Sequence, residues 1–537
     1  MAGSGPVEGF APEVIVVGAG SAGCAATRRL VDAGVDVLLL EAGGPDDSPA
    51  IHDPARFHEL WLAAEDWAYH TVPQAHAADR ALHWPRGKVL GGSSCLNGLI
   101  HVRGARADYA QWVALGAEGW DWDDVLPVFV RMEDFDGGAS VVHGAGGPLR
   151  VLSRYDLAPL HESIVAAAQE IGVARNPDYN AGVLDGVAQM QLTIRDGRRD
   201  SAASAYLRPV LDAPNLRVLT GAHAHRVLLE GTRATGVEFA RNGELHRVAA
   251  GVEVIVSAGA IESPALLLRS GIGPAAHLGE HGIDVVADLP GVGENLHDHL
   301  LTPSIWSAER EIVPFAPGLS PIQTHLWWRS RPDLPGPDTQ PIHFSVPLYE
   351  PWMEGPPNAF TLMGGMVRPE SRGTVRLSGA RPDDPLLIDP RILSAEADLV
   401  ALEASLGQMR EMGTAPALAQ WGARELYPGP DVRRAADVRD YVRRTAISYH
   451  HQVGTCKMGV DTDAVVDPRL RVHGVSGLRV ADASVMPAVT SGNTNAPSLM
   501  IGERVADFVT ADAAAAAQSA ERTSAAARSP ERTAPSM

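Results

Sequence analysis

The chain has 537 residues, of which 45% are hydrophobic and 20% are charged, and its formal net charge at pH 7 is −20. This length exceeds the ~250–300 residues at which a single hydrophobic core stops growing, so two large domains are expected. The acidic balance argues against a nucleic-acid partner, because binding to phosphates needs a basic surface.

Three features of the sequence bear on its location. It contains no apolar run long enough to span a bilayer, and the first residues, MAGSGPVEGF, carry no charged-then-apolar signal segment. The three cysteines Cys24, Cys95 and Cys456 are an odd number and lie far apart, which argues against a disulfide framework. We therefore expect a cytoplasmic protein without a membrane span.

The first elements form a βαβ pattern. A buried-strand run at 14–17 precedes three glycines at G-x-G-x-x-G spacing, a helical pattern at 22–31, a second apolar run at 35–40 and Glu41. The three glycines are Gly18, Gly20 and Gly23. Glycine lets the backbone approach a pyrophosphate, the helix start offers unpaired N–H groups to its charge, and the carboxylate accepts ribose hydroxyls. The pattern predicts a dinucleotide site, but it does not distinguish NAD from FAD.

Later segments carry a resemblance that spans nearly the whole chain. GKVLGGSSCLNGLIHVRG (87–104) and GAIESPALLLRSGIG (259–273) resemble the two signature segments of the glucose-methanol-choline (GMC) flavoprotein oxidoreductases. Further matches follow in the family's order: DWAYHTVPQ (66–74), PGVGENLHDH (290–299), RPESRGTVRLS (368–378) and VADASVMPAVTSGNTNAPSLMIGE (480–503). The sequence is therefore identified as a member of this family.

The resemblance implies an α/β fold of two domains. A Rossmann-like FAD-binding domain, discontinuous over 11–155, 196–300 and 455–511, would carry an inserted substrate domain of antiparallel sheet flanked by helices at 156–195 and 301–454. Residues 512–537 are poor in large apolar side chains and are expected to form a disordered tail, although an alanine-rich helix at its start stays open.

The resemblance also assigns residues to the cofactor, FAD. The expected contacts to its pyrophosphate, ribose, adenine and flavin are Gly18, Gly20, Ser21, Gly23, Glu41, Ala42, Gly91, Gly92, Ser93, Ser94, Asn97, Gly98, Ala224, Asp482, Ala483 and Asn495. Some relatives attach FAD covalently through a histidine at what corresponds to Leu96, and leucine has no nucleophile. Cys95 is adjacent and thiols can bond flavins, but a small buried filler is the favoured interpretation. We therefore expect non-covalent FAD.

The segment YHHQVGTCKMG (449–459) contains two adjacent histidines. A metal site would need further ligands at a recognised spacing, and a redox site would need a cysteine near Cys456; neither is present in the sequence nearby. The family's catalytic histidine stands three residues before the glycine, which assigns that role to His451. His450 is expected to act as a pocket wall or secondary group. The family's second catalytic residue, an asparagine or histidine in SGNTNAP, is assigned to Asn495.

These residue types suit the oxidation of an alcohol to an aldehyde or ketone. The site needs a base that is neutral near pH 7, and histidine has an ordinary pKa of about 6.5. The carboxamide of Asn495 would orient the substrate oxygen without adding charge, and a bound flavin would take the hydride. Dioxygen or an electron carrier would reoxidise it, so oxidase and dehydrogenase both stay open.

The substrate is open too. The acidic balance would suit choline, whereas a histidine at 450, where an aromatic residue often stands, favours a neutral primary or secondary alcohol. His343, Phe344, Tyr349 and Trp352 could line the pocket, but ordinary packing is favoured for them. His297 and His299, in NLHDH, are expected to be structural. A non-redox lyase of the hydroxynitrile lyase type is the alternative function; a flavin-binding protein without catalysis is disfavoured by the histidine and asparagine.

Overall fold

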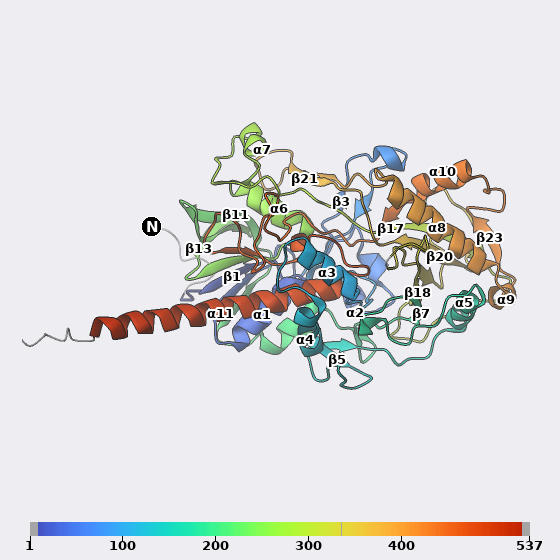
Figure 1. Ribbon diagram of the computed structural model, residues 1–537, viewed down its shortest axis with the longest axis horizontal. Helices are drawn as coiled ribbons and strands as arrows, with labels where there is room; N and C mark the ends of the chain where they lie inside the picture. The colour runs from blue at the N-terminus through green and yellow to red at the C-terminus, as the bar shows by residue number, and fades with distance from the viewer. Residues whose placement is uncertain (1–8, 335, 529–537) are drawn as a thin grey trace, which may run out of the picture.

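The computed structural model describes residues 9–334 and 336–528, which form an elongated molecule with a large sheet toward each end (Figure 1). One sheet has five parallel strands in the order β10-β2-β1-β14-β25. These are β1 Val14–Val17, β2 Val37–Leu40, β10 Leu216–Leu219, β14 Glu253–Val256 and β25 Leu478–Val480. β1, β2 and β14 are buried at every residue, as expected for parallel strands covered on both faces.

Helices and a smaller sheet cover this parallel sheet. Helix α1 (Ser21–Asp32) follows β1 and packs along α11 (Asn495–Arg528), while α6 (Gly259–Arg269) follows β14. A three-stranded antiparallel sheet contains β11 (His223–Glu230), β12 (Arg233–Arg241) and β13 (Glu244–Ala249). The shorter helices are α2 Pro49–His52, α3 Arg106–Ala114, α4 Trp122–Met132 and α7 Ala275–Glu280.

The second large sheet has seven strands and is antiparallel. Its strands, in the order β23-β17-β20-β19-β18-β7 with β24 also on β17, are β23 Arg424–Tyr427, β17 Leu300–Ser307, β20 Ala359–Met366, β19 Ile342–Phe344, β18 Ile322–Trp327, β7 Gly186–Gln189 and β24 Ile447–Ser448. The helices beside it are α5 Pro159–Glu170, α8 Glu396–Gly413, α9 Pro416–Ala419 and α10 Ala435–Thr445. A parallel sheet with helices plus an antiparallel sheet flanked by helices confirms the predicted α/β fold class.

Two-stranded pairs complete the structure. They are β3 Tyr69–His70 with β4 His83–Trp84, β5 Glu133–Phe135 with β6 Leu149–Val151, β8 Ile194–Arg195 with β9 Arg198–Arg199, β15 Ile272–Gly273 with β16 Ala287–Asp288, and β21 Thr374–Leu377 with β22 Leu386–Asp389. In the described part of the chain, the helices lack the combined length and apolar character that crossing a membrane requires.

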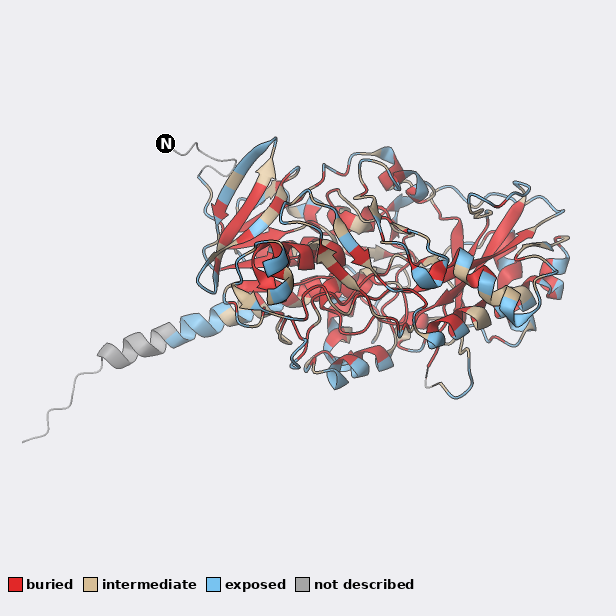
Figure 2. Cartoon of the chain, turned by 90° about the horizontal axis from the view of Figure 1, so that it is seen from above, coloured by how far each residue is buried: buried red, intermediate tan, exposed pale blue. Residues whose placement is uncertain are grey.

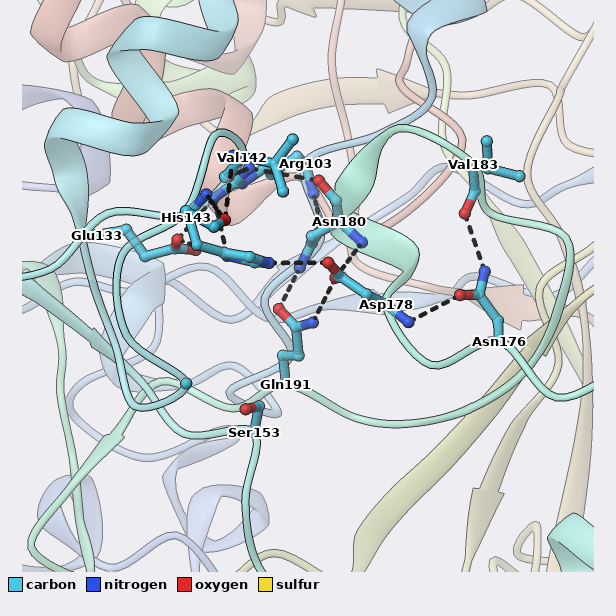
Figure 3. A network of polar contacts seen from close by, with 12 residues as sticks. Arg103, Glu133, Val142, His143, Ser153, Asn176, Asp178, Asn180, Val183 and Gln191 are labelled. Carbon is cyan, nitrogen blue, oxygen red and sulfur yellow. Dashed lines mark hydrogen bonds and ion pairs between the residues drawn. The ribbon is translucent and has the colours of Figure 1, made fainter.

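A buried polar network fixes the loop that follows residues 91–98 (Figure 3). The Arg103 guanidinium donates to Glu133 over 2.7 Å, and the His143 ring lies 2.8 Å from Glu133 and 3.0 Å from Asp178. Asn180 accepts from the Arg103 backbone N–H at 2.8 Å. The network therefore ties the chain near β5 to the loop that leads into β7.

Helix α11 replaces the expected disordered tail up to residue 528 and agrees with the alternative of an alanine-rich helix at its start. The helix continues through residue 528, while 529–537 lie outside the described residues. Its alanines favour the helix, and Asp512 accepts hydrogen bonds from Arg469 at 2.6 Å and Arg479 at 2.7 Å. Beyond these contacts, from about residue 513 to 519, the helix leaves the body and its residues are exposed (Figure 2).

Candidate active site

The glycine-rich turn after β1 opens onto a cleft. A Cβ on Gly18 would lie 2.4 Å from the Ser257 carbonyl oxygen, and one on Gly23 would lie 1.9 Å from the Gly18 carbonyl oxygen, so both glycines allow close backbone packing. A Cβ on Gly20 would meet nothing within 4 Å. Because Gly20 lines the cleft, the space beside it is left free for a bound group.

Glu41 lies in the same cleft at the end of β2. Its carboxylate accepts hydrogen bonds from the backbone N–H groups of Ala19 at 2.9 Å and Gly43 at 2.8 Å. Burial raises the pKa of Glu41 to about 7, although these N–H groups act in the opposite direction. A ligand hydroxyl could donate a further hydrogen bond here, because each carboxylate oxygen has two acceptor sites.

The 91–98 segment supports the cleft from the other side. A Cβ on Gly92 would lie 2.6 Å from the Gly20 Cα, so these two turns touch backbone to backbone. Ser94 donates to the Gly91 carbonyl at 2.6 Å, and Asn97 accepts from Arg199 at 2.7 Å. The side chains of Ser94 and Asn97 therefore bond to other protein groups and fix the conformation of the segment.

The predicted cofactor residues divide into two groups. Those that line the cleft are Gly18, Gly20, Ser21, Glu41, Ala42, Gly92, Ser93, Ala224, Asp482 and Ala483. Those that stand outside its lining are Gly23, Gly91, Ser94, Asn97, Gly98 and Asn495. The Asp482 carboxylate accepts from the Gly259 N–H at 2.9 Å and from Ser263 at 2.5 Å, which fixes the start of α6 against β25.

Several lining residues at the end near Ala224 had no predicted role. Tyr69 donates to Glu262 over 2.5 Å, Arg269 donates to the other Glu262 oxygen over 2.7 Å, and the Trp67 and His223 rings lie 5.4 Å apart. Trp67 and Tyr69 belong to the DWAYHTVPQ match, which was the available signal for them. The open space at Gly20, the buried acid and these aromatic rings together fit a dinucleotide with an aromatic base.

His451 lies where the two halves of the molecule meet. β24 pairs with β17, and the Tyr449 N–H donates to the His299 carbonyl at 2.9 Å, so the segments before β17 and after β24 run together. The His451 N–H donates to Asp298 at 2.8 Å, and the Tyr449 ring stacks on the imidazole with centroids 4.5 Å apart. Burial lowers the pKa of His451 well below its ordinary value, and nearby His299 lowers it further. The imidazole is thus neutral at pH 7.

The residue opposite His451 is Asn493, which corrects the assignment of Asn495. The Asn493 Nδ2 lies 3.1 Å from His451 Nε2. Asn495 begins α11 instead, and its Oδ1 accepts a hydrogen bond of 2.7 Å from Ser21 at the start of α1. The two asparagines flank Thr494, and the turn into α11 directs them to different partners.

His450 points away from this pair. Its backbone has a φ of +66°, a left-handed conformation that is rare for a non-glycine residue. Its ring lies edge-on to Trp61 at 5.2 Å, and its carbonyl accepts from Arg86 at 2.7 Å. The left-handed turn separates the two histidine side chains, and no contact joins His450 to Asn493 among the residues described.

A cluster of amides and aromatic rings surrounds His451 and Asn493. Gln340 donates to Asn493 Oδ1 at 3.1 Å and lies 3.3 Å from His325 Nδ1. The His325 ring packs against Trp327, with centroids 4.2 Å apart, and against Tyr179 at 4.5 Å. Within the described residues, His325 Nε2 and Gln340 Oε1 are buried without hydrogen-bond partners.

The cysteines and the possible metal ligands lie apart from this cluster. Cys24, Cys95 and Cys456 are free and buried. In the part of the chain that the structure describes, His277, Glu280 and His281 are the group spaced closely enough to hold a metal ion. The His277 Nε2 there accepts the Leu377 N–H at 3.1 Å. Neither His450 nor His451 belongs to this group.

Comparisons with known proteins show the family of this chain. The N- and C-terminal family models described as GMC oxidoreductase match residues 13–301 and 369–502. The mitochondrial choline dehydrogenase of Homo sapiens is 41% identical over 92% of this chain and 89% of its own length. The oxygen-dependent choline dehydrogenase of Brucella ovis is 39% identical over 93% of this chain and 95% of its own.

Solved structures are similar over more than nine tenths of the chain. The crystal structure of pyridoxine 4-oxidase from Mesorbium loti has a TM-score of 0.88 and 38% identity, covering 92% of this chain and 98% of that one. A formate oxidase has a TM-score of 0.87 and 25% identity, covering 94% of this chain and 99% of that one. These similar proteins are dehydrogenases and oxidases, which gives the lyase alternative no support.

Proposed function

Because this chain belongs to the GMC oxidoreductase family and is an FAD-dependent oxidoreductase of CH–OH donors, we propose that it oxidises a neutral, polar alcohol with His451 as the base and Asn493 as the orienting amide. The contact that carries this proposal is the one between Asn493 Nδ2 and His451 Nε2, 3.1 Å apart. It places a neutral imidazole beside an uncharged donor.

His451, Asn493 and the residues of the cleft have separate roles in this reaction. The substrate hydroxyl donates its proton to His451 Nε2, which is able to accept because burial keeps the ring neutral. Asn493 donates to the substrate oxygen and holds it toward His451. When bound, FAD supplies the acceptor for the hydride from the carbinol carbon. The residues that would hold FAD are those that line the cleft from Gly18 to Ala483.

The surroundings of the pair support a neutral substrate over a quaternary ammonium. The nearby carboxylate, Asp298, is occupied: its oxygens accept from the His451 N–H, from Ser448 and from Gln452. The cationic Arg86 acts on His451 instead, and it would repel a substrate cation. His325 Nε2 and Gln340 Oε1, buried without partners among the described residues, add one polar donor and one polar acceptor, neither of them charged, to the cluster beside Asn493. The name of the similar pyridoxine 4-oxidase is consistent with such a substrate.

Non-covalent FAD is also part of the proposal. Leu96 offers no nucleophile. Burial raises the pKa of the adjacent Cys95 thiol to about 12, and its Sγ donates to the Leu90 carbonyl at 3.3 Å, so the thiolate that a covalent bond needs is not formed near pH 7. Cys95 thus supports the interpretation of a buried filler.

An anaerobic experiment tests this function. The FAD-loaded protein is mixed with choline, benzyl alcohol, pyridoxine and a short aliphatic alcohol, and bleaching of oxidised flavin is followed. We expect bleaching by a neutral alcohol, and a roughly 100- to 10,000-fold slower rate in His451→Ala that still binds FAD. Efficient bleaching by choline alone would refute the substrate class, and an unaltered His451→Ala would refute the base. Admission of air or of a quinone then identifies the acceptor.

A further inference from the structure

We propose that His299 is a positioning residue that, together with Asn493, holds His451 in the tautomer whose Nε2 carries the lone pair that accepts the substrate proton. This inference rests on the proposed role of His451 as the base. The two rings meet nitrogen to nitrogen: His299 Nδ1 lies 3.0 Å from His451 Nδ1, and the ring planes are perpendicular. His299 is fully buried and His451 is 7% exposed.

The contact constrains where hydrogens can be. Two unprotonated nitrogens repel each other at 3.0 Å, and so do two N–H groups, so one Nδ1 must carry a hydrogen and the other must accept it. Burial lowers the pKa of His299 to about 3, and it also lowers the pKa of His451. Both rings are therefore neutral, with one N–H each.

Contacts on the far sides of the two rings decide which Nδ1 donates the hydrogen bond and which accepts it. Gln340 donates to Asn493 Oδ1 at 3.1 Å, which turns the Asn493 amide nitrogen toward His451 Nε2. An amide nitrogen only donates, so His451 Nε2 must accept and its hydrogen is on Nδ1. His299 Nδ1 is then the acceptor, and its own hydrogen is on Nε2.

The other side of His299 agrees with this assignment. Its Nε2 makes no hydrogen bond of ordinary geometry among the described residues. A contact with the backbone of Val367 raises the pKa of His299 and opposes the larger lowering by burial. The nitrogen that faces away from His451 is therefore left to carry the hydrogen of His299 once Nδ1 accepts from His451.

The arrangement has a chemical consequence. When His451 Nε2 takes the substrate proton, the ring becomes an imidazolium whose Nδ1–H still donates to His299. His299 remains a neutral acceptor and stabilises that charge without itself taking a proton. Its position is fixed by the backbone pairing of Leu300 with Ser448, which ties the two histidine segments together.

Substitutions at His299 separate this role from packing. Asparagine keeps a polar atom at the position of Nδ1, whereas leucine removes it. In His299→Leu, the Nδ1–H of His451 is left buried without a partner. The rate of anaerobic flavin bleaching should therefore fall by about 10- to 100-fold and its pH profile should shift, with FAD binding retained. His299→Asn should recover most of the rate and the profile.

His297 provides a matched control in the same loop. It is also buried, its Nδ1 lies 2.6 Å from the Asn295 carbonyl and its Nε2 accepts from Val489 at 2.9 Å, so its polar contacts are with other residues than His451. We expect His297→Asn to lower the thermal midpoint and leave the pH profile of bleaching in place. A change of profile equal to that of His299→Leu would mean that the effect is structural.

A direct readout of the tautomer completes the test. In 15N-histidine-labelled protein, the His451 signals are identified by their loss in His451→Gln, and they report which ring nitrogen carries hydrogen even without substrate. We expect hydrogen on Nδ1 in the wild type and a changed pattern in His299→Leu. Hydrogen on Nε2 in the wild type, or an unchanged tautomer and rate in His299→Leu, would overturn the inference. An unchanged rate in His451→Ala would instead refute the proposed function, whatever the tautomer.

Discussion

Replacing Asn493 and Asn495 separately is the sharpest test of the proposed site. Asn493 accepts from Gln340 at 3.1 Å and its Nδ2 lies 3.1 Å from His451 Nε2, and both partners are buried. Asn493→Ala leaves those two groups without their contacts, and a buried polar group without a partner costs about 1–3 kcal/mol. If that loss falls on the transition state, the bleaching rate constant divided by the substrate's apparent Kd drops by about 10- to 100-fold.

Asn495→Ala removes a different contact, the 2.7 Å bond from Ser21 between the first residues of α1 and α11. A single hydrogen bond contributes about 1 kcal/mol, so we expect a lower thermal midpoint and weaker FAD binding, while bleaching with saturating FAD stays near the wild-type rate. Stopped-flow absorbance and an FAD titration of the apoprotein measure the two effects. A loss of bleaching in Asn495→Ala with little change in Asn493→Ala would refute the assignment.

Three further predictions concern the cleft, the cofactor and the buried network. Gly20→Val places side-chain atoms in the open space of the cleft, at a φ of −78° that any residue adopts. The affinity for FAD should therefore fall at least tenfold while the apoprotein keeps its stability. An unchanged Kd for FAD in a fluorescence titration would contradict the site. Acid precipitation should release all the flavin into the supernatant, and colour left in the pellet would show a covalent bond. Burial lowers the pKa of His143, but its bonds to Asp178 and Glu133 outweigh this and raise it to about 9. Its stabilising contribution is therefore complete below about pH 6.5 and is lost as the pH rises through 9, at up to about 1.4 kcal/mol per pH unit. Unfolding of His143→Gln should lack this alkaline slope, and an equal slope in both proteins would argue against the charged histidine.

Local patterns in the sequence predicted the elements around the cleft closely. The strand expected at 14–17 is β1, the helix expected at 22–31 is α1 at Ser21–Asp32, and Glu41 lies in the cleft. Each of these follows from residues close together in the chain: an apolar run, three glycines and an acid after the second run. Such short-range patterns are visible in the sequence because strands of a parallel sheet are buried on both faces and so consist of continuous apolar runs.

The cluster around His451, for which we propose the catalytic role, could not be predicted in the same way. SGNTNAP holds two asparagines, and only the turn into α11 decides that Asn493 meets His451. His299 looked structural because its contact with His451 joins residues 152 positions apart through the pairing of β17 and β24. The tail beyond residue 511 was expected to be disordered by its composition, but ion pairs at Asp512 anchor the start of the helical part.

The tie between α1 and α11 has a consequence for biosynthesis. Ser21 bonds to Asn495 and Arg29 bonds to Glu503, and each pair spans 474 residues. A ribosome that adds about 5–20 residues per second needs roughly 24–95 s to traverse that distance. The nascent βαβ unit spends this interval without its partner helix, so its helix-covered form can be completed only after residues 495–503 have been synthesised.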